Sequence, residues 1–464
     1  MEAAALEGKR VTVMGLGRFG GGASVTRYLC ERGATVLLTD IEPEEKLAAS
    51  VAQIADLVRS GTVQLRLGGH NVSDFTTCDL VVANPAVPKP WDNRFLRSAW
   101  AAKIPVTTEI GLTIARLPNR ARVIGITGSA GKSTTSAMIH HVLKQCGFAT
   151  VFGGNIGGSL LGEIDSITPE TFVVLELSSA MLCWLGDLAR VGPAEFDHAP
   201  ASEGWSPHVA VVTNLSPNHL DWHGDLAHYR RSKQELLRAQ RSGDVAVLPP
   251  GSESAEWKTN SGVERRVPRV EVSGLAIPGK HNRQNASVAI EAALAAASGL
   301  DRARAVNAVK TFAGLPHRLE LAATISRAGG SVRCFNDSKS TTPEACLLAV
   351  AAFDEPGEVG AGRVHLIAGG YDKGSDLSAI GALARRLAGL YTIGKTGDAI
   401  AAASDGAAKK CGTVESAVAS AIGAAKPGDV LLLSPACASW DQFENYEKRG
   451  ELFVREVRAV GGVR

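Results

Sequence analysis

The chain has 464 residues, of which 45% are hydrophobic, and this length predicts about three globular domains. Lysine and arginine (49 together) nearly balance aspartate and glutamate (47), so charge indicates neither a nucleic-acid partner nor a membrane partner. No apolar run reaches the roughly 20 residues that cross a membrane, and the eight cysteines form no C-x-x-C pair typical of zinc or redox motifs. We expect a cytoplasmic protein with reduced thiols.

The first predicted motif is a glycine-rich turn between a strand and a helix. An apolar strand over residues 10–14 is followed by Gly15-Leu16-Gly17-Arg18-Phe19-Gly20 and a helix to about residue 32. The next strand, residues 34–39, ends at Asp40, about 20 residues after the glycines. This is the dinucleotide pattern, whose glycines let the backbone approach a pyrophosphate. Because NAD, FAD and UDP all carry one, the pattern leaves the ligand open.

A second turn completes this part of the chain. Asn84-Pro85-Ala86-Val87-Pro88 follows an apolar strand over residues 80–83, and ligands bind at such carboxyl ends in open parallel sheets. Residues 117–120 have the composition of a linker. We therefore predict a first domain at residues 1–118.

A phosphate-binding loop follows the linker. The apolar strand over residues 123–126 leads into Gly128-Ser129-Ala130-Gly131-Lys132-Ser133-Thr134, and a helix is expected over residues 136–145. Backbone N–H groups and the positive helix end would bind phosphate, Lys132 would reach the outer phosphates, and Ser133 or Thr134 would hold Mg²⁺. The spacing is T-G-x-x-G-K-[ST]-T, which is tighter than the usual G-x-x-x-x-G-K-[ST]. The alternative is a glycine turn with a surface lysine.

Glu176 and His219 are candidate metal ligands near this loop. Glu176 ends an apolar strand over residues 172–175, where an acid could instead serve a helix N-terminus. His219 lies beyond a strand over residues 209–213, and a second metal site there competes with a structural histidine. Lys233 lies on a helix expected over residues 226–241.

The rest of the second domain contains one more glycine loop and two irregular stretches. Gly153-Gly154-Asn155-Ile156-Gly157 follows a predicted strand over residues 150–152. Residues 190–207 and 251–272 are polar and irregular, and we expect both to be surface insertions. An alanine-rich helix to about residue 298 precedes the next boundary, so the second domain is predicted at residues 119–316.

The third domain is predicted at residues 317–464. Strands are expected over residues 332–336, 365–368 and 430–433, each followed by a polar motif where a ligand would bind. The predicted fold class is therefore α/β with three domains. A central parallel sheet of the P-loop ATPase type lies between an N-terminal and a C-terminal Rossmann-like domain.

The order of the motifs resembles the Mur ligase family over essentially the whole chain. The matching motifs are T-G-x-x-G-K-[ST]-T, G-G-N-I-G, L-E-L-S-S, T-N-x-x-x-x-H-L-D, G-x-H-N-x-x-N, L-P-H-R, N-D-S-K and S-P-A-C-A-S. The last two, with Asn445-Tyr446-Glu447-Lys448-Arg449-Gly450, resemble the branch that adds D-glutamate to UDP-N-acetylmuramoyl-L-alanine.

The resemblance implies a role for each motif. The implied UDP-substrate site contains Gly17, Arg18, Phe19, Asp40, Asn84, Asn155 and Ser178. The implied ATP site contains Gly128, Ser129, Ala130, Gly131, Lys132, Ser133, Thr134, Asn282, Asn285, Arg318 and Asp337. Two Mg²⁺ ions would be held by Ser133, Glu176, His219 and Lys233, with Lys233 carbamylated. The D-glutamate site would contain Lys339, Thr341, Lys373, Ser439 and Tyr446. The implied catalytic residues are Lys132, His219, Lys233 and Lys339.

The implied reaction belongs to peptidoglycan precursor synthesis. ATP would phosphorylate the terminal carboxylate of UDP-N-acetylmuramoyl-L-alanine, and the acyl phosphate would accept the amine of D-glutamate. The alternatives are a Mur-type ligase with another amino acid or acceptor, a nicotinamide dehydrogenase resting on residues 15–40, and a nucleotide-binding protein without catalysis. We expect a monomer without nucleic-acid or membrane partners.

Overall fold

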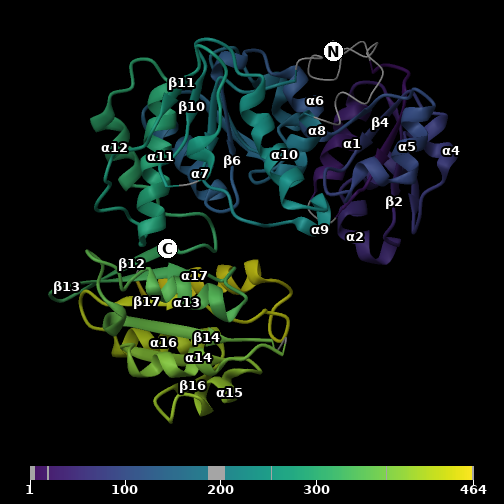
Figure 1. Cartoon of the computed structure of the whole chain (residues 1–464). Coiled ribbons are helices and arrows are strands. Elements are labelled where there is room, and N and C mark those ends of the chain that lie inside the picture. Colours follow the sequence, from purple (N-terminus) through teal and green to yellow (C-terminus); the bar gives the residue numbers. More distant parts are fainter. Residues whose placement is uncertain (1–5, 18–19, 187–203, 252, 372–373, 462–464) are drawn as a thin grey trace. The chain divides into compact units, whose positions relative to one another are not determined.

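The computed structural model describes residues 6–17, 20–186, 204–251, 253–371 and 374–461. Three predicted site residues, Arg18, Phe19 and Lys373, lie outside this part, as does most of the predicted insertion at 190–207. The chain divides into two compact units, residues 1–270 with 287–306 (unit 1) and residues 271–286 with 307–464 (unit 2). Helices accompany the sheets of both units (Figure 1). The predicted α/β fold with mostly parallel sheets is confirmed.

The N-terminal sheet of unit 1 has five parallel strands in the order β3-β2-β1-β4-β5. Its strands are β1 (Arg10–Met14), β2 (Thr35–Asp40), β3 (Val63–Leu67), β4 (Leu80–Ala83) and β5 (Val106–Thr107). The accompanying helices are α1 (Gly21–Glu31), α2 (Glu44–Ala52), α3 (Ala55–Arg59), α4 (Val72–Thr76), α5 (Arg94–Ala101) and α6 (Glu109–Arg116). Strands β2 and β3 lie on one side of β1, and β4 and β5 lie on the other, so the strand order reverses at β1. Open parallel sheets bind ligands at such a reversal, which is where the first glycine loop lies.

The central sheet of unit 1 has six parallel strands in the order β11-β10-β9-β6-β8-β7. Its strands are β6 (Val123–Thr127), β7 (Thr150–Gly154), β8 (Phe172–Glu176), β9 (Val209–Val212), β10 (Val245–Val247) and β11 (Glu264–Arg266). The helices of this region are α7 (Lys132–Gln145), α8 (Ser179–Leu185), α9 (Leu220–His223) and α10 (Leu226–Arg238), while α11 (Lys280–Ala296) and α12 (Arg302–Lys310) span the division between the units. Strands β6, β8 and β9 are buried along their whole length, as expected for a parallel sheet covered on both faces.

The prediction that residues 251–272 are an irregular surface insertion is wrong for β11 (Glu264–Arg266). Strand β11 pairs in parallel with β10 and extends the central sheet by one strand. Trp257, in the same segment, is buried. The charged sequence of β11 gave no apolar pattern from which a strand could be predicted. An edge strand tolerates charged side chains that a central strand would exclude.

The two sheets of unit 1 share a hydrophobic cluster. Side chains of β1, β2 and α6 pack in one cluster with side chains of β8, β9 and the segment around Leu160 and Leu161. A second cluster joins Phe75 and Phe95 of the N-terminal part to Trp184 and Trp222 of the central part. Burial of each such side chain stabilises the folded state by about 1.5–3 kcal/mol. The N-terminal and central sheets therefore form one packed body within unit 1.

Unit 2 contains a six-stranded mixed sheet in the order β12-β13-β17-β14-β15-β16. Its strands are β12 (Glu320–Arg327), β13 (Gly330–Asn336), β14 (Val364–Gly369), β15 (Gly389–Ile393), β16 (Lys409–Gly412) and β17 (Val430–Leu433). Its helices are α13 (Pro343–Ala351), α14 (Ser378–Ala382), α15 (Gly397–Ala402), α16 (Val414–Ala424) and α17 (Tyr446–Val460). The sequence did not predict β12, which pairs antiparallel with β13 across a turn at Gly329, while the other strands pair in parallel.

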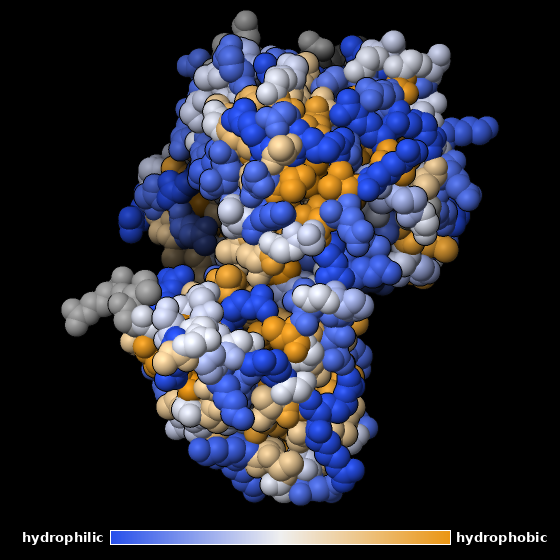
Figure 2. Space-filling model, turned by 90° about the vertical axis from the view of Figure 1, so that its left-hand side faces the viewer, coloured by the Kyte–Doolittle hydropathy of each residue, from blue (hydrophilic) through white to orange (hydrophobic). Residues whose placement is uncertain are grey.

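Few large hydrophobic side chains are exposed among the described residues. They are Ile41, Val72, Leu220, Val267, Leu348, Tyr371, Trp440 and Val460. Figure 2 shows hydrophilic side chains over most of one face, with apolar side chains between them. Among the described helices, none combines the length and the apolar character needed to cross a bilayer.

Candidate functional site

The loop at residues 128–134 leads from a buried strand into a helix whose N-terminus has no side-chain cap. Gly131 has a positive φ of 79° and occupies the N-cap position of α7. Because the N-cap glycine makes no side-chain hydrogen bond to α7, the backbone of Ser133 and Thr134 offers donors at the positive helix end. This geometry suits a phosphate group.

Asn214 holds the tip of this loop. Its Oδ1 accepts hydrogen bonds from the N–H groups of Ser129 (3.2 Å) and Ala130 (2.8 Å), and its Nδ2 donates to the Ala130 carbonyl (3.0 Å). The Tyr229 hydroxyl and Ser129 Oγ are hydrogen bonded at 2.8 Å. A phosphate would therefore meet the N–H groups nearer α7 rather than those at the tip. Asn214 and Tyr229 were not predicted as site residues, although both follow β9 in the same stretch as His219.

Lys132 folds back over its own loop. Its Nζ donates to the carbonyls of Gly128 (2.9 Å) and Ser129 (3.1 Å). The ammonium group thus lies beside the uncapped start of α7, where it adds positive charge for an anionic ligand. Lys132 is half-buried here, whereas the alternative, a glycine turn with a surface lysine, would leave it exposed.

Glu176 lies fully buried at the end of β8, next to the strand that precedes the loop. The register pairs Ile126 of β6 with Glu176. Asn155 Nδ2 donates to Glu176 Oε1 at 2.9 Å, and the Asn155 N–H donates to the Glu176 carbonyl at 2.8 Å. Glu176 Oε2 is buried and has no hydrogen-bond partner among the residues that the structure describes. Since a buried carboxylate oxygen rarely lacks a partner, this atom is suited to a cation.

Lys233 reaches the same place from α10. Its Nζ donates to the Gly128 carbonyl (2.8 Å) and to Thr127 Oγ1 (3.3 Å). Burial, and then the positive charge of Lys132, hold the pKa of Lys233 well below its ordinary value of 10.5, while Glu176 opposes this shift. The structure thus brings Lys132, Glu176 and Lys233 together, and the Lys233 ammonium gives up its proton more readily than that of an exposed lysine.

His219 is exposed at the N-cap of α9, with a backbone φ of 52°. In the described part of the chain, no hydrogen bond or ion pair joins its side chain to Glu176 or Lys233. Among the described residues, no group of three or more His, Cys, Asp or Glu side chains is arranged to hold a metal ion. A cation beside Glu176 would therefore need other oxygen ligands, such as the Ser133 hydroxyl or the ligand's own phosphates.

The first glycine loop is tied to β2 through Asp40. Asp40 Oδ2 accepts from the Gly17 N–H (3.1 Å), and Oδ1 accepts from the Glu42 N–H (2.9 Å). A Cβ atom at Gly15 would lie 2.9 Å from Asn84 Cβ, so the glycine is needed where this loop meets β4. Gly17, Asp40 and Asn84 are therefore brought together at one edge of the sheet. Ser178 lies elsewhere in unit 1 and caps α8, accepting from the Met181 N–H at 3.2 Å.

In unit 2, Asp337 is buried at the end of β13. Its Oδ2 accepts from Ser434 Oγ (2.8 Å) and its Oδ1 accepts from the Leu319 N–H (3.1 Å). Burial raises the pKa of Asp337 to about 7. The predicted nucleotide residue Asn282 is also buried, and its Nδ2 donates to the Pro278 carbonyl at 2.6 Å. Asn285 lies on the same helix and is partly buried, whereas Arg318 is exposed.

Four of the five predicted D-glutamate residues lie in the described part of unit 2: Lys339 and Thr341 after β13, Ser439 after β17, and Tyr446 at the start of α17. Lys339 Nζ lies 5.1 Å from the centre of the Tyr446 ring, and Ser439 is buried on the loop after β17. Burial raises the pKa of Tyr446 to about 12, so its hydroxyl stays protonated. Thr341 follows in the same loop as Lys339.

Arg449 is a buried residue that the sequence analysis did not select. Its side chain donates to Ser338 Oγ (3.0 Å) and to the carbonyls of Ser338 (2.8 Å), Cys437 (3.1 Å) and Ala438 (3.1 Å). These bonds join the loops that carry Lys339 and Ser439. The sequence signal was its place in the run Asn445 to Gly450, one of the motifs that carry the resemblance.

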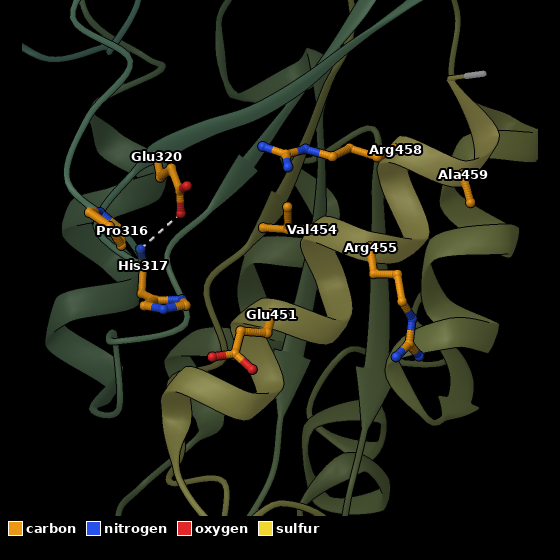
Figure 3. A pocket seen from close by; sticks show the side chains of 8 residues that line it. All are labelled: Pro316, His317, Glu320, Glu451, Val454, Arg455, Arg458 and Ala459. Atoms are coloured by element: carbon orange, nitrogen blue, oxygen red, sulfur yellow. Dashed lines mark hydrogen bonds between the residues drawn. The ribbon is translucent and has the colours of Figure 1, made fainter. Parts of the chain in front are cut away.

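A separate cavity of about 600 Å³ lies in unit 2 between the loop at Pro316 and α17 (Figure 3). The His317 N–H donates to Glu320 Oε2 at 3.0 Å on one side, and Arg455 and Arg458 line the other side. Its lining includes none of the predicted site residues, so it adds nothing to the predicted site.

Comparisons with known proteins cover the whole chain. The matching family models are Mur ligase MurD-like, N-terminal domain (residues 9–108), Mur ligase middle domain (126–273) and Mur ligase, glutamate ligase domain (317–437). Proteins named UDP-N-acetylmuramoylalanine--D-glutamate ligase from Acidobacterium capsulatum and Pelotomaculum thermopropionicum are each 33% identical to this chain. The alignments cover 98% and 97% of this chain and 98% of each relative. The crystal structure of a UDP-N-acetylmuramate-alanine ligase from Thermotoga maritima shares the fold, with a TM-score of 0.52, 19% identity and coverage of 97% of this chain and 99% of that one.

Proposed function

The chain belongs to the Mur ligase family, and we propose that it uses ATP to join D-glutamate to UDP-N-acetylmuramoyl-L-alanine. The observation that carries this proposal is the 33% identity, over nearly the whole chain, to proteins named for that reaction. The convergence of Lys132, Glu176 and Lys233 at the start of α7 supports it. The alternative of a nicotinamide dehydrogenase does not explain why these three side chains lie together.

The reaction needs an activated carboxyl group, because a free carboxylate has no good leaving group. An oxygen of the L-alanyl carboxylate attacks the γ-phosphorus of ATP, a new P–O bond forms, and the bond to the bridging oxygen breaks to release ADP. The amine of D-glutamate then attacks the acyl carbon, the C–O bond to phosphate breaks, and the amine loses a proton. Lys132 and the first N–H groups of α7 would stabilise the charge on the transferred phosphoryl group.

Mg²⁺ would be held by Glu176, Ser133, His219 and Lys233, as two ions. Bound there, Mg²⁺ would neutralise phosphate charge and hold the reacting oxygens in line. Glu176 Oε2, which has no hydrogen-bond partner among the described residues, is suited to bind Mg²⁺, since a hard cation prefers carboxylate oxygen. Asn155 would orient the carboxylate through its bond to Oε1.

Lys233 would serve as a carbamate. Its neutral amine attacks the carbon of CO₂, an N–C bond forms, one C–O π pair moves to oxygen, and the amine proton passes to solvent. This step reverses the sign of the side chain, so that it can approach a cation. The lowered pKa of Lys233 supports the step, because only the unprotonated amine is a nucleophile.

The remaining site residues are assigned by the same proposal. The sugar nucleotide would contact Gly17, Arg18, Phe19, Asp40, Asn84, Asn155 and Ser178. The nucleotide set would include Gly128 to Thr134 with Asn282, Asn285, Arg318 and Asp337, and the D-glutamate set Lys339, Thr341, Lys373, Ser439 and Tyr446. We also propose domains at residues 1–118, 119–316 and 317–464 in a monomeric cytoplasmic enzyme.

The test is ADP and phosphate release with UDP-N-acetylmuramoyl-L-alanine, ATP, Mg²⁺ and a panel of D- and L-amino acids. We expect turnover with D-glutamate and at most weak turnover with the others. Preference for another amino acid would establish a different Mur-type ligase. No ADP with any member of the panel would overturn the proposal.

A further inference from the structure

Glu109 connects the N-terminal sheet of unit 1 to a loop of the central sheet. It is the first residue of α6 and is half-buried. Its Oε1 accepts hydrogen bonds from Ser159 Oγ (2.5 Å) and from Thr113 Oγ1 (3.1 Å). Ser159 ends the glycine loop that contains Asn155. A side chain of the N-terminal part thus holds one end of a loop whose other end bonds Glu176.

The loop between Asn155 and Ser159 is tightly closed. The Gly154 N–H donates to the Gly158 carbonyl at 3.1 Å. Gly154 has a φ of +103°, and a Cβ there would lie 2.3 Å from the Glu176 carbonyl oxygen. Because the loop has little room to deform, movement of Ser159 is expected to move Asn155.

We propose that Glu109 is a positioning residue, which holds the loop at Ser159 so that Asn155 faces the sugar-nucleotide acceptor. This inference deepens the proposed function and rests on it. Glu109 does not touch the reacting atoms in this role; it acts through Ser159 and Asn155.

The contact needs a hydrogen-bond acceptor rather than a negative charge. Ser159 Oγ donates to Glu109 and in turn accepts from the Leu161 N–H at 3.2 Å, so its proton is directed toward Glu109. Burial also raises the pKa of Glu109 above its ordinary value, which disfavours the charged form. Glutamine has an amide oxygen in the same place, so Glu109→Gln is the conservative variant that should preserve the role.

A second link between the same parts of unit 1 provides a matched control. Arg32, just after α1, contacts Asp165 with an N–O distance of 2.8 Å. Asp165 lies in the short helix η4 (Leu161–Ser166) and not in the glycine loop. Asp165→Asn therefore weakens a link between the two parts without releasing Ser159.

The experiment compares steady-state kinetics of wild type, Glu109→Ala, Glu109→Gln, Ser159→Ala, Asp165→Asn and the double variant of Glu109→Ala with Ser159→Ala. Each alanine variant should raise the KM for UDP-N-acetylmuramoyl-L-alanine about tenfold and leave the KM for ATP within about twofold. The double variant should match either single variant, because both remove the same contact. Glu109→Gln and Asp165→Asn should stay within about twofold of wild type.

The contrary results are equally specific. If Glu109→Ala resembles Asp165→Asn, or if it only lowers kcat with every KM unchanged, the positioning role is rejected. If Glu109→Ala does not fold, the KM values of Ser159→Ala, which loses only a hydroxyl group, test the positioning role. A wild-type protein that forms no ADP overturns the proposed function and this inference with it, whereas an active wild type with unaffected variants overturns this inference only.

Discussion

Lys233 in unit 1 and Arg449 in unit 2 are two cations buried to the same extent, each with a side chain 1% exposed. Burial lowers the pKa of both, that of Arg449 to about 10. Arg449 donates four hydrogen bonds, three to carbonyls and one to a hydroxyl. Lys233 donates to one carbonyl and one hydroxyl, with Lys132 nearby.

We infer that the difference suits Arg449 to a structural role and Lys233 to a reactive one. A guanidinium that spreads its donors over carbonyl groups remains charged at all ordinary pH values and fixes the loops that it bonds. A lysine ammonium near a second cation loses its proton readily and becomes a nucleophile. Burial alone therefore does not say which role a cation has; its hydrogen-bond partners and its charged neighbours do.

The largest effect is expected from Lys132→Ala, which removes the charge next to Lys233. Turnover should fall about 10²–10³-fold, because the transferred phosphoryl group loses a fixed cation. The measurement is phosphate release under saturating substrates. Near-normal release by a folded Lys132→Ala protein would contradict the assignment of the site.

Arg449→Met should act on stability instead. It removes the Arg449 donors from the carbonyls of Ser338, Cys437 and Ala438, although Ala438 still accepts from the Tyr371 N–H at 2.8 Å. Each buried group left unpaired destabilises by about 1–3 kcal/mol. We expect unit 2 to unfold at lower urea concentration, with Arg449→Lys intermediate because it has fewer donors. Unchanged unfolding of Arg449→Met would mean that water replaces the arginine without loss.

Lys233→Ala should lower activity about 10–100-fold through the metal site, with a higher Mg²⁺ requirement. Lys233→Arg is the matched control, because it keeps a cation that cannot form a carbamate, and it should be equally impaired. After incubation with ¹³C-bicarbonate, wild type should give a carbamate NMR signal that both variants lack. An unchanged Mg²⁺ dependence in Lys233→Ala would refute the carbamate role.

The smallest effect concerns Asp337, the residue before Ser338, which Arg449 bonds. Its folded pKa of about 7 lies above the ordinary 3.8, so the folded chain binds more protons than the unfolded chain between these values. The stability of unit 2 should therefore fall as pH rises from about 4 to 7. Asp337→Asn should flatten this slope in urea unfolding, and an unaltered slope would show that other groups cause it.

Local patterns could be predicted from the sequence because their residues are neighbours in the chain. The buried strands β6 and β8 and the glycine loop at 128–134 followed from apolar runs and glycine spacing. Strand β11 was not predicted, because its charged residues are tolerated at a sheet edge, and β12, which pairs antiparallel with β13, was not predicted either.

The sequence by itself determined the fold class, the family resemblance and the candidate residues, since each depends on order along the chain. Only the tertiary structure decided that Lys233 is buried away from solvent. It also decided that Arg449 is hydrogen bonded to Ser338, 111 residues away in the chain, and Glu109 to Ser159, 50 residues away. The physical reason is that burial and hydrogen-bond partners are set by packing between distant segments, which a linear pattern does not encode.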